Sequence, residues 1–321
     1  MAQAEQPSPP LQTPAVAILL VSLSILCFAF SDALVKWIAH TYDATQIIMI
    51  RSLVALPLIA MLLSRAGVWH RLREVQQGWL ISRVIFGSMS FVTFIQALKF
   101  LPLAETIAVS FAGPLFITAL SVPLLKETVG PRRWSAVIVG LIGVVIIMRP
   151  GAGVFHPAAL WALGSAALYA MTAISTRKLA MRTPTAVVLA WVNLYVLIMM
   201  TGGVLIFDTW VTPSLHDLMF LIGIGFTSTV GQYLGVEAYR RAQPSMLAPF
   251  DYTALVWGAM LGFMFWGEIP SWSLVVGSVV LVASGLYILH RERVNNRMVN
   301  RGCDSGAERR ARRLNRFRWS R

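Results

Sequence analysis

Four ionisable residues lie inside long apolar stretches of this sequence. Asp32 and Lys36 fall in the first stretch, Arg51 in the second and Asp251 in a late one. A charge at the centre of a bilayer costs roughly 2.5–3.5 kcal/mol on insertion scales, so each of these residues needs a partner or a function. A carboxylate can bind a solute or carry a proton, and the planar guanidinium of arginine can hold a carbonyl or anionic group through parallel N–H donors.

Each of these residues has a structural and a functional interpretation. Asp32 and Lys36 are four residues apart and share one face of a helix, so they form either a self-neutralising pair or a place where Asp32 binds substrate or a proton. Arg51 either ties its helix to a carboxylate such as Asp32 or Asp251, or recognises a substrate. Asp251 follows Pro249, which frees a backbone carbonyl and can open the helix; this makes Asp251 a candidate for proton coupling or substrate contact.

Amide and aromatic side chains within the apolar stretches add candidates for substrate contact: Gln96, Trp191, Asn193, Gln232, Tyr233 and Tyr252. Most aromatic residues in such helices pack or form belts at the membrane interface. Trp191 is distinctive because it aligns with Arg51 in the internal repeat described below. A pocket with a cation on one side and an indole on the other would suit a planar, polar metabolite.

The composition identifies an integral membrane protein. Of 321 residues, 57% are hydrophobic and 13% are charged, against about 25% charged in soluble domains. Apolar runs of about 20 residues recur, each long enough to cross a bilayer, and they are continuous rather than alternating, which excludes a transmembrane β-barrel. We expect an all-α fold with ten transmembrane helices at 15–39, 45–64, 79–99, 104–125, 133–149, 157–177, 184–207, 215–239, 246–266 and 271–290.

The chain contains an internal duplication. The stretch Ala97–Glu127 returns as Ala238–Glu268, 141 residues later, and each copy ends in its glutamate. The repeat predicts two five-helix halves, 15–149 and 157–290, flanked by disordered tails at 1–14 and 291–321. Because five is odd, the second half must be inverted in the membrane. The loop charges reverse between the halves accordingly.

The charges also predict orientation and location. Most lysines and arginines lie in loops that place both termini in the cytoplasm of a bacterial inner-membrane protein. Eleven arginines follow His290 and supply much of the net charge of +13; we interpret this segment as a tail beside anionic lipids rather than a nucleic-acid site. The five histidines and two cysteines show no metal or disulfide spacing, and neither a nucleotide-binding loop nor a catalytic group is present, so no metal, cofactor or ATP is expected.

Two inverted five-helix halves are typical of transporters with a binding site at their interface. The sequence resembles the EamA branch of the drug/metabolite transporter superfamily over residues 15–290. The resemblance is carried by the ten-helix duplication, Lys126–Glu127 and Gly267–Glu268 at the ends of helices four and nine, and Arg51 early in helix two. It implies structural or gating roles for Glu127 and Glu268. Residues 31–37, SDALVKW, resemble riboflavin and S-adenosylmethionine carriers.

We therefore expect a secondary transporter that moves a small organic metabolite by alternating access, with uptake of riboflavin or a similar vitamin as the first choice. Export of amino acids or drugs is the alternative, and a membrane-embedded enzyme or a non-transporting assembly protein is the alternative of another class. Proton coupling and homodimer formation stay open. Small residues in helices five and ten permit close packing or dimerisation, although Gly140 and Gly143 are one residue short of the G-x-x-x-G spacing.

Overall fold

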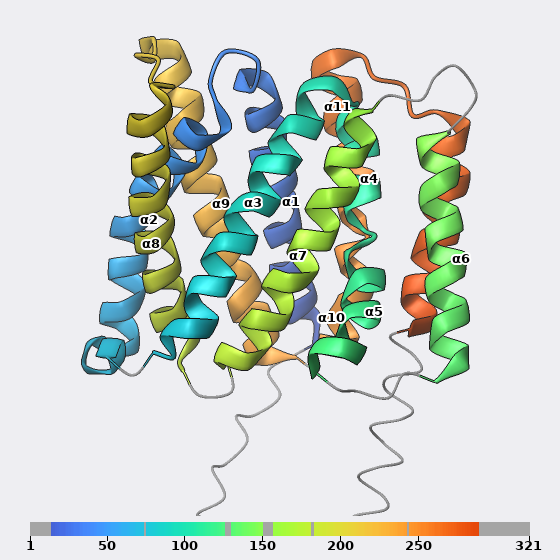
Figure 1. Cartoon of the computed structure of the whole chain (residues 1–321), viewed down its shortest axis with the longest axis horizontal. Coiled ribbons are helices and arrows are strands. Elements are labelled where there is room, and N and C mark those ends of the chain that lie inside the picture. The colour runs from blue at the N-terminus through green and yellow to red at the C-terminus, as the bar shows by residue number, and fades with distance from the viewer. Residues whose placement is uncertain are drawn as a thin grey trace, which may run out of the picture.

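The structure is a computed structural model that describes residues 14–73, 75–125, 130–149, 157–180, 183–242 and 244–288. The predicted segments 1–13 and 289–321 lie outside these ranges, as does Glu127. The described residues form one bundle of long, roughly antiparallel helices (Figure 1). The helices are α1 Pro14–Ile38, α2 Ala44–Ala66, α3 Gln77–Phe100, α4 Leu103–Ser110, α5 Gly113–Leu125, α6 Pro131–Met148, α7 Ala158–Ala180, α8 Thr185–Phe207, α9 Leu215–Arg241, α10 Pro244–Asp251, α11 Thr253–Trp266 and a last helix, Trp272–Ile288.

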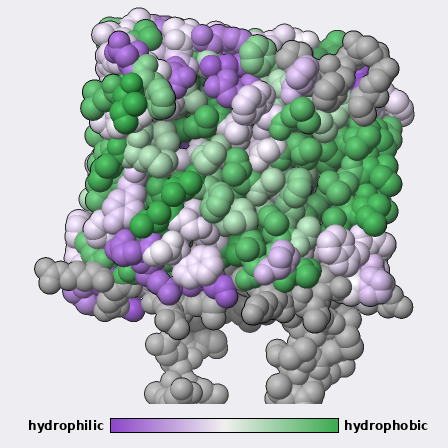
Figure 2. Space-filling model, viewed as in Figure 1, coloured by the Kyte–Doolittle hydropathy of each residue, from purple (hydrophilic) through white to green (hydrophobic). Residues whose placement is uncertain are grey.

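The prediction of an all-α fold with ten spans is confirmed. Seven continuous spans in the described ranges are long and apolar enough to cross a membrane, α4 and α5 being counted together as one. The shorter helices Arg133–Met148 and Trp272–Ile288 and the pair α10–α11 supply the other three spans. The side of the bundle in view is apolar through the middle and more polar toward both ends, as a membrane-embedded surface requires (Figure 2).

The fourth and ninth spans are each broken into two helices. The first break lies at Phe111 and Ala112, between α4 and α5, and the second at Tyr252, between α10 and α11. Pro249 lies inside α10, three residues before its break. Phe111 and Tyr252 are repeat-related positions, so the same interruption occurs once in each half.

The two halves run in opposite directions and pack in equivalent ways. In Figure 1, α1 rises from the end of the bundle near the chain termini, whereas its repeat counterpart α7 descends from the opposite end. α1 packs on α9 and, correspondingly, α7 packs on α3; α2 packs on α8, its own counterpart. The duplication read from the sequence is therefore a pseudo-two-fold symmetry of the fold.

This symmetry extends to individual hydrogen bonds. The Ser24 hydroxyl of α1 donates to the Gly231 carbonyl of α9 at 2.7 Å. The Ser165 hydroxyl of α7 donates to the Ser90 carbonyl of α3 at 2.9 Å. Ser165 and Gly231 lie 141 residues after Ser24 and Ser90, respectively, so both bonds occupy the same place in the two halves. All four residues are buried, where a hydroxyl needs such a partner.

Helices five and ten use their small residues to pack on each other within the chain. A Cβ added to Gly143 of α6 would lie 2.9 Å from the Gly277 carbonyl oxygen of the last helix, and one added to Gly277 would lie 2.6 Å from the Gly143 oxygen. Each glycine therefore admits the backbone of the other helix. The close packing expected of these residues is thus satisfied inside one chain.

Candidate functional site

Arg51 is the buried cation of the first half, and three side chains surround it. Its Nε donates to the Ser228 hydroxyl of α9 at 3.1 Å. Its guanidinium carbon lies 4.5 Å from the centroid of the Phe91 ring on α3, a cation–π distance. Asp32 on α1 interacts with it electrostatically. Within the described part of the chain, this leaves the two terminal nitrogens of Arg51 without a hydrogen-bond partner and thus available to a ligand.

Glycines on α9 bring this group of residues together. A Cβ at Gly225 would lie 2.6 Å from the Val54 Cβ and 3.2 Å from the Arg51 carbonyl oxygen, so only glycine lets α9 approach α2 this closely. Gly231 makes a comparable approach, because a Cβ there would lie 3.1 Å from the Cys27 Cβ on α1. Ser228 lies between these two glycines and is thereby positioned beside Arg51.

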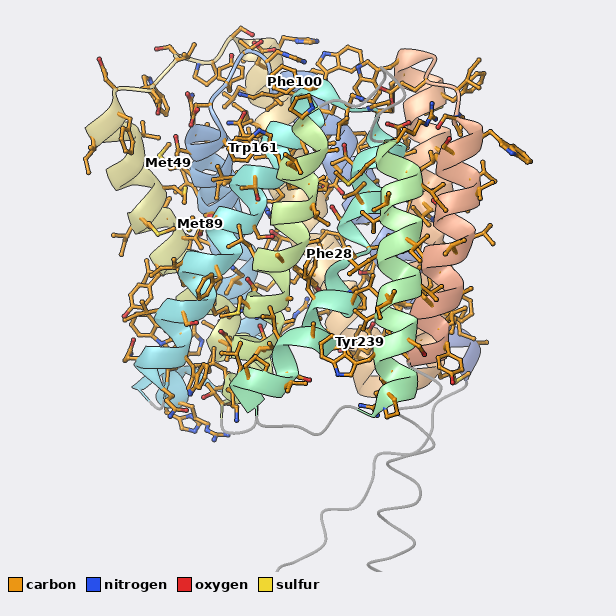
Figure 3. The ribbon with its side chains drawn as sticks, turned by 45° about the vertical axis from the view of Figure 1, so that its right-hand side comes forward. Phe28, Met49, Met89, Phe100, Trp161 and Tyr239 are labelled. Carbon is orange, nitrogen blue, oxygen red and sulfur yellow. The ribbon has the colours of Figure 1, made fainter. Side chains whose placement is uncertain are left out.

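A second polar group lies around the break of the ninth span. The Tyr239 hydroxyl of α9 contacts the Asp251 carboxylate at 3.4 Å, and Tyr169 of α7 interacts with Asp251 electrostatically. The sequence predicted a role for Asp251 without identifying these two tyrosines as its partners. Tyr169 is 54% exposed and Tyr239 41% exposed. In Figure 3 Tyr239 lies toward the end that holds the chain termini, while Phe28, the repeat counterpart of Tyr169, lies at mid-height.

Tyr252 packs at the helix break itself. Its ring centroid lies 5.1 Å from that of Phe111. Its hydroxyl points at the last helix, where a Cβ added to Gly285 would come within 2.0 Å of it. This predicted site residue therefore joins both broken spans and the last helix at the centre of the fold.

The predicted Asp32–Lys36 pair does not form. Lys36 instead donates to the Glu268 carboxylate after α11 and to the Leu101 carbonyl oxygen, the latter at 2.9 Å. Glu268 also accepts the backbone N–H of Leu103, the first residue of α4, at 2.9 Å. Since residue 36 lies near the end of α1, its side chain reaches the neighbouring helix ends rather than the carboxylate one turn below. Lys36 consequently belongs with Glu268 in a contact between the halves.

The pocket expected between Arg51 and Trp191 is also wrong. The Trp191 indole donates to the Leu72 carbonyl oxygen at 2.7 Å and packs on Tyr195, with a centroid separation of 5.4 Å. Leu72 belongs to the 3₁₀ turn Trp69–Arg73 between α2 and α3. Repeat-related positions need not face each other, and the buried indole N–H binds the nearest free carbonyl. Phe91, which the sequence reasoning overlooked, supplies the aromatic ring beside Arg51.

The remaining predicted site residues are placed as follows. Asn193 donates to the Leu189 carbonyl of its own helix at 2.9 Å, which fits a structural role. Gln96 and Gln232 are half-buried, and Tyr233 is 37% exposed. Gln232 is the repeat counterpart of Phe91, so its place opposite the Arg51 group follows from symmetry. Among the described residues, no group of three or more His, Cys, Asp or Glu side chains could hold a metal ion.

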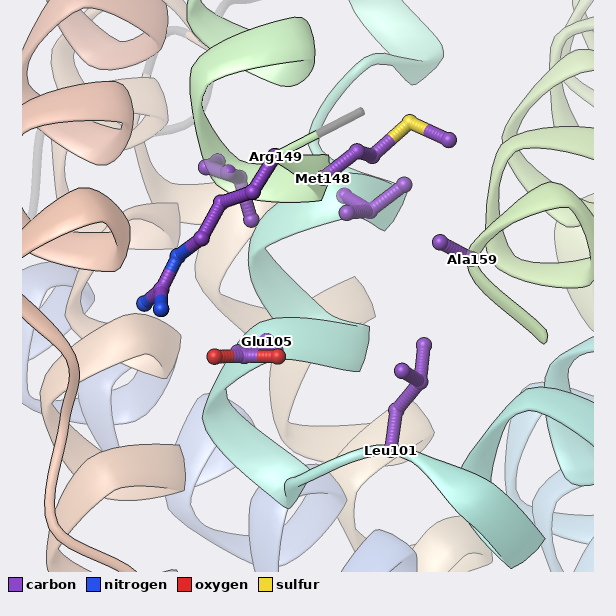
Figure 4. A pocket seen from close by; sticks show the side chains of 7 residues that line it. Leu101, Glu105, Met148, Arg149 and Ala159 are labelled. Carbon is purple, nitrogen blue, oxygen red and sulfur yellow. The ribbon is translucent and has the colours of Figure 1, made fainter. Parts of the chain in front are cut away.

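A separate small cavity lies near the end of the bundle remote from the termini (Figure 4). Its volume is about 50 Å³, and Glu105 of α4 and Arg149 after α6 supply its polar lining. The Ser271 hydroxyl donates to Glu105 at 3.3 Å, and Arg149 interacts with Glu105 electrostatically. A space of this size holds water rather than an organic metabolite. We therefore assign Glu105 to the packing of this end.

Comparisons with known proteins support this architecture. The model of the EamA-like transporter family matches residues 15–149 and again residues 156–290. The chain is 28% identical to a riboflavin transporter of Vibrio cholerae, covering 85% of this chain and 92% of that protein. It is 27% identical to an S-adenosylmethionine uptake transporter of Rickettsia prowazekii (84% and 91% covered) and 26% identical to the pseudopaline exporter CntI of Pseudomonas aeruginosa (83% and 93%).

A solved crystal structure shares the fold, with a TM-score of 0.60, 20% sequence identity, and coverage of 85% of this chain and 96% of the other. The family match covers both halves, and the named relatives are transporters. These findings agree with the duplicated, inverted helices and with the expected class of function. The chain therefore belongs to the EamA-like transporter family, and it is a multi-pass membrane transporter.

Proposed function

We propose that this protein is a secondary transporter that takes up riboflavin or a similar planar vitamin across the bacterial inner membrane by alternating access, with both termini in the cytoplasm. One observation carries the choice of substrate class. The Arg51 guanidinium is buried on the Phe91 ring with its two terminal nitrogens unpaired within the described chain. A planar heterocycle with carbonyl groups along one edge complements such a site, because it can accept paired N–H donors and still stack on an aromatic face.

Asp32 and Asp251 suit proton coupling. Both are partly buried carboxylates within the bundle, and neither forms an ion pair within 4 Å among the described residues. A carboxylate in such a place gains or loses a proton more readily than one fixed to a basic partner. We propose that one of them takes up the proton that moves with the substrate.

Uptake by the purified full-length chain in proteoliposomes tests this function. Radiolabelled riboflavin is supplied outside, and an inward proton gradient is imposed or abolished with an ionophore. We expect saturable uptake that the gradient increases and that unlabelled riboflavin competes away. Complementation of a bacterium unable to make riboflavin, at limiting external vitamin, gives a second measurement.

The alternative substrates are tested in the same preparation. S-adenosylmethionine is supplied as a labelled solute, and amino acids and cationic drugs are loaded inside the vesicles. Transport of one of these solutes with no riboflavin uptake would refute the vitamin assignment and keep the carrier. A folded protein that moved none of these solutes would count against both.

A further inference from the structure

The two ends of the bundle are closed to different extents. At the end remote from the chain termini, α4 packs closely on α11. The internal repeat relates α4 to α10 and α11 to α5, so a symmetric protein would pack α10 on α5 at the other end. Within the described ranges α5 and α10 are not packed in this way. The structure is therefore closed at one end by a contact that its counterpart lacks.

Two glycines make the closed contact tight. A Cβ at Gly258 would lie 2.7 Å from Ile107 Cδ1 of α4, and one at Gly262 would lie 3.7 Å from the Leu103 Cβ and 2.8 Å from the Glu268 carboxylate. Gly258 and Gly262 are four residues apart, so they form one strip of bare backbone on α11. The sequence analysis overlooked this G-x-x-x-G spacing.

The first half has no such strip. The positions 141 residues earlier, on α5, are Ile117 and Ser121. A β-branched side chain thus stands where α11 presents only a hydrogen atom. Because close approach between membrane helices depends on small residues, α5 cannot reproduce the α4–α11 contact at the other end.

A charged contact fastens the same end. Glu268 accepts from Lys36 with one carboxylate oxygen and from the Leu103 N–H with the other. The Lys36 ammonium also lies 5.1 Å from the Trp266 ring centroid. Gly267, in the left-handed conformation with φ 66°, ends α11 and turns Glu268 back toward α4. At the repeat-related position the first half has Lys126 in place of this glycine.

We infer that Gly258, Gly262 and the Lys36–Glu268 pair form a one-sided latch that keeps the carrier closed at the end remote from its termini while no substrate is bound. This inference rests on the proposed alternating access, and it adds which end is shut at rest and which residues shut it. Uptake then requires the latch to open, so substrate arriving at that end competes with contacts that only this half of the protein can make. The residues of the latch set the balance between the two open states rather than contacting the substrate.

Hydrogen–deuterium exchange of the full-length protein in lipid nanodiscs tests the latch without any substrate. The Leu103 amide is bonded to Glu268, so exchange at the start of α4 reports the latch directly. Gly258→Ile introduces the residue found at the repeat-related position. We expect it to increase the exchange rate over residues 101–110 and 262–268 by about fivefold or more. Gly202→Ile on α8 is the matched control, because a Cβ there meets nothing within 4 Å.

Glu268→Gln provides a second route that adds no volume. It removes the charge that holds Lys36 and weakens the bond to Leu103, so the same two segments should exchange faster while residues 215–241 stay unchanged. Wild-type exchange at the start of α4 in both folded variants would overturn the latch. Because the readout needs no substrate, a failure of riboflavin uptake with altered exchange would reject the proposed substrate and keep the latch. Normal uptake with unaltered exchange would do the reverse.

Discussion

The rings of Phe111 and Tyr252 meet at the centre of the bundle, with centroids 5.1 Å apart and planes inclined by 35°. The internal repeat places these two residues at the same position of the two halves, and each stands where its span breaks into two helices. The pseudo-two-fold axis therefore passes close to this contact. A helix break at the axis lets each end of a span tilt separately, which is what an exchange of conformation between two inverted halves requires.

The Tyr252 hydroxyl predicts a specific packing defect. Gly285→Ala would place a Cβ 2.0 Å from that hydroxyl, so the last helix or the break of the ninth span must shift. Overpacking of this kind costs typically about 1–3 kcal/mol. We expect a lower thermal unfolding temperature in detergent. Tyr252→Phe removes the clashing oxygen, so the double variant should recover most of the loss, whereas Gly164→Ala on α7, where a Cβ meets nothing within 4 Å, should be silent. Additive losses in the double variant would contradict this packing.

The architecture of this protein was predictable because it depends on local and periodic signals. Apolar runs give the spans, loop charges give their alternation, and the spacing of 141 residues gives the inverted halves. The break at Tyr252 follows Pro249, and that proline indicated it. The break at Phe111 has no proline within three residues before it, and symmetry with the second half was the only signal for it.

The partners of the buried polar residues were not predictable in the same way. The i,i+4 spacing suggested Asp32 for Lys36, but the ammonium binds Glu268, which lies 232 residues away in the sequence. A long flexible side chain near a helix end can reach several neighbours, and only the packing of the helix ends selects one. Trp191 illustrates the same limit. Its repeat position suggested a role opposite Arg51, whereas its indole N–H binds the nearest free carbonyl, that of Leu72.

Arg51→Lys should weaken substrate binding. A lysine keeps the charge but loses the planar fork, the Nε bond to Ser228 and much of the stacking on Phe91. We expect KM for uptake to rise about tenfold, because two hydrogen bonds to a charged donor are lost or distorted. Arg65→Lys, at the exposed end of the same helix, is the matched control and should leave KM unchanged. An unchanged KM in Arg51→Lys would show that Arg51 serves packing alone.

Asp251→Asn should reduce transport more than Glu105→Gln. Asp251 contacts Tyr239 beside the break of the ninth span, whereas Glu105 lies in the first turn of α4 and binds Ser271. Both substitutions remove one negative charge at nearly constant volume. We expect the rate of proton-driven uptake to fall at least tenfold in Asp251→Asn if the carboxylate carries the proton, and about twofold in Glu105→Gln. Equal, wild-type-like rates in the two variants would remove Asp251 from the site.

Trp191→Phe separates stability from binding. The substitution removes the indole donor and leaves the Leu72 carbonyl without its partner, which should cost about 1 kcal/mol of unfolding free energy. Because Trp191 packs against the 3₁₀ turn and Tyr195, KM for uptake should stay within a factor of about two. Thermal unfolding and uptake kinetics measured on the same preparation distinguish the two effects. A large rise in KM with unchanged stability would return Trp191 to the binding site.

The inverted repeat and the proposed orientation can be tested together by labelling. Trp69, after α2, and Trp210, after α8, follow equivalent spans of the two halves and are 49% and 48% exposed. The structure places them at opposite ends of the bundle. In a Cys27→Ser, Cys303→Ser background, Trp210→Cys should react with a membrane-impermeant maleimide in intact cells, and Trp69→Cys should react only after the membrane is permeabilised. Labelling of both from the same side would contradict the inverted halves, whereas the reversed pattern would keep the repeat and overturn the cytoplasmic location of the termini.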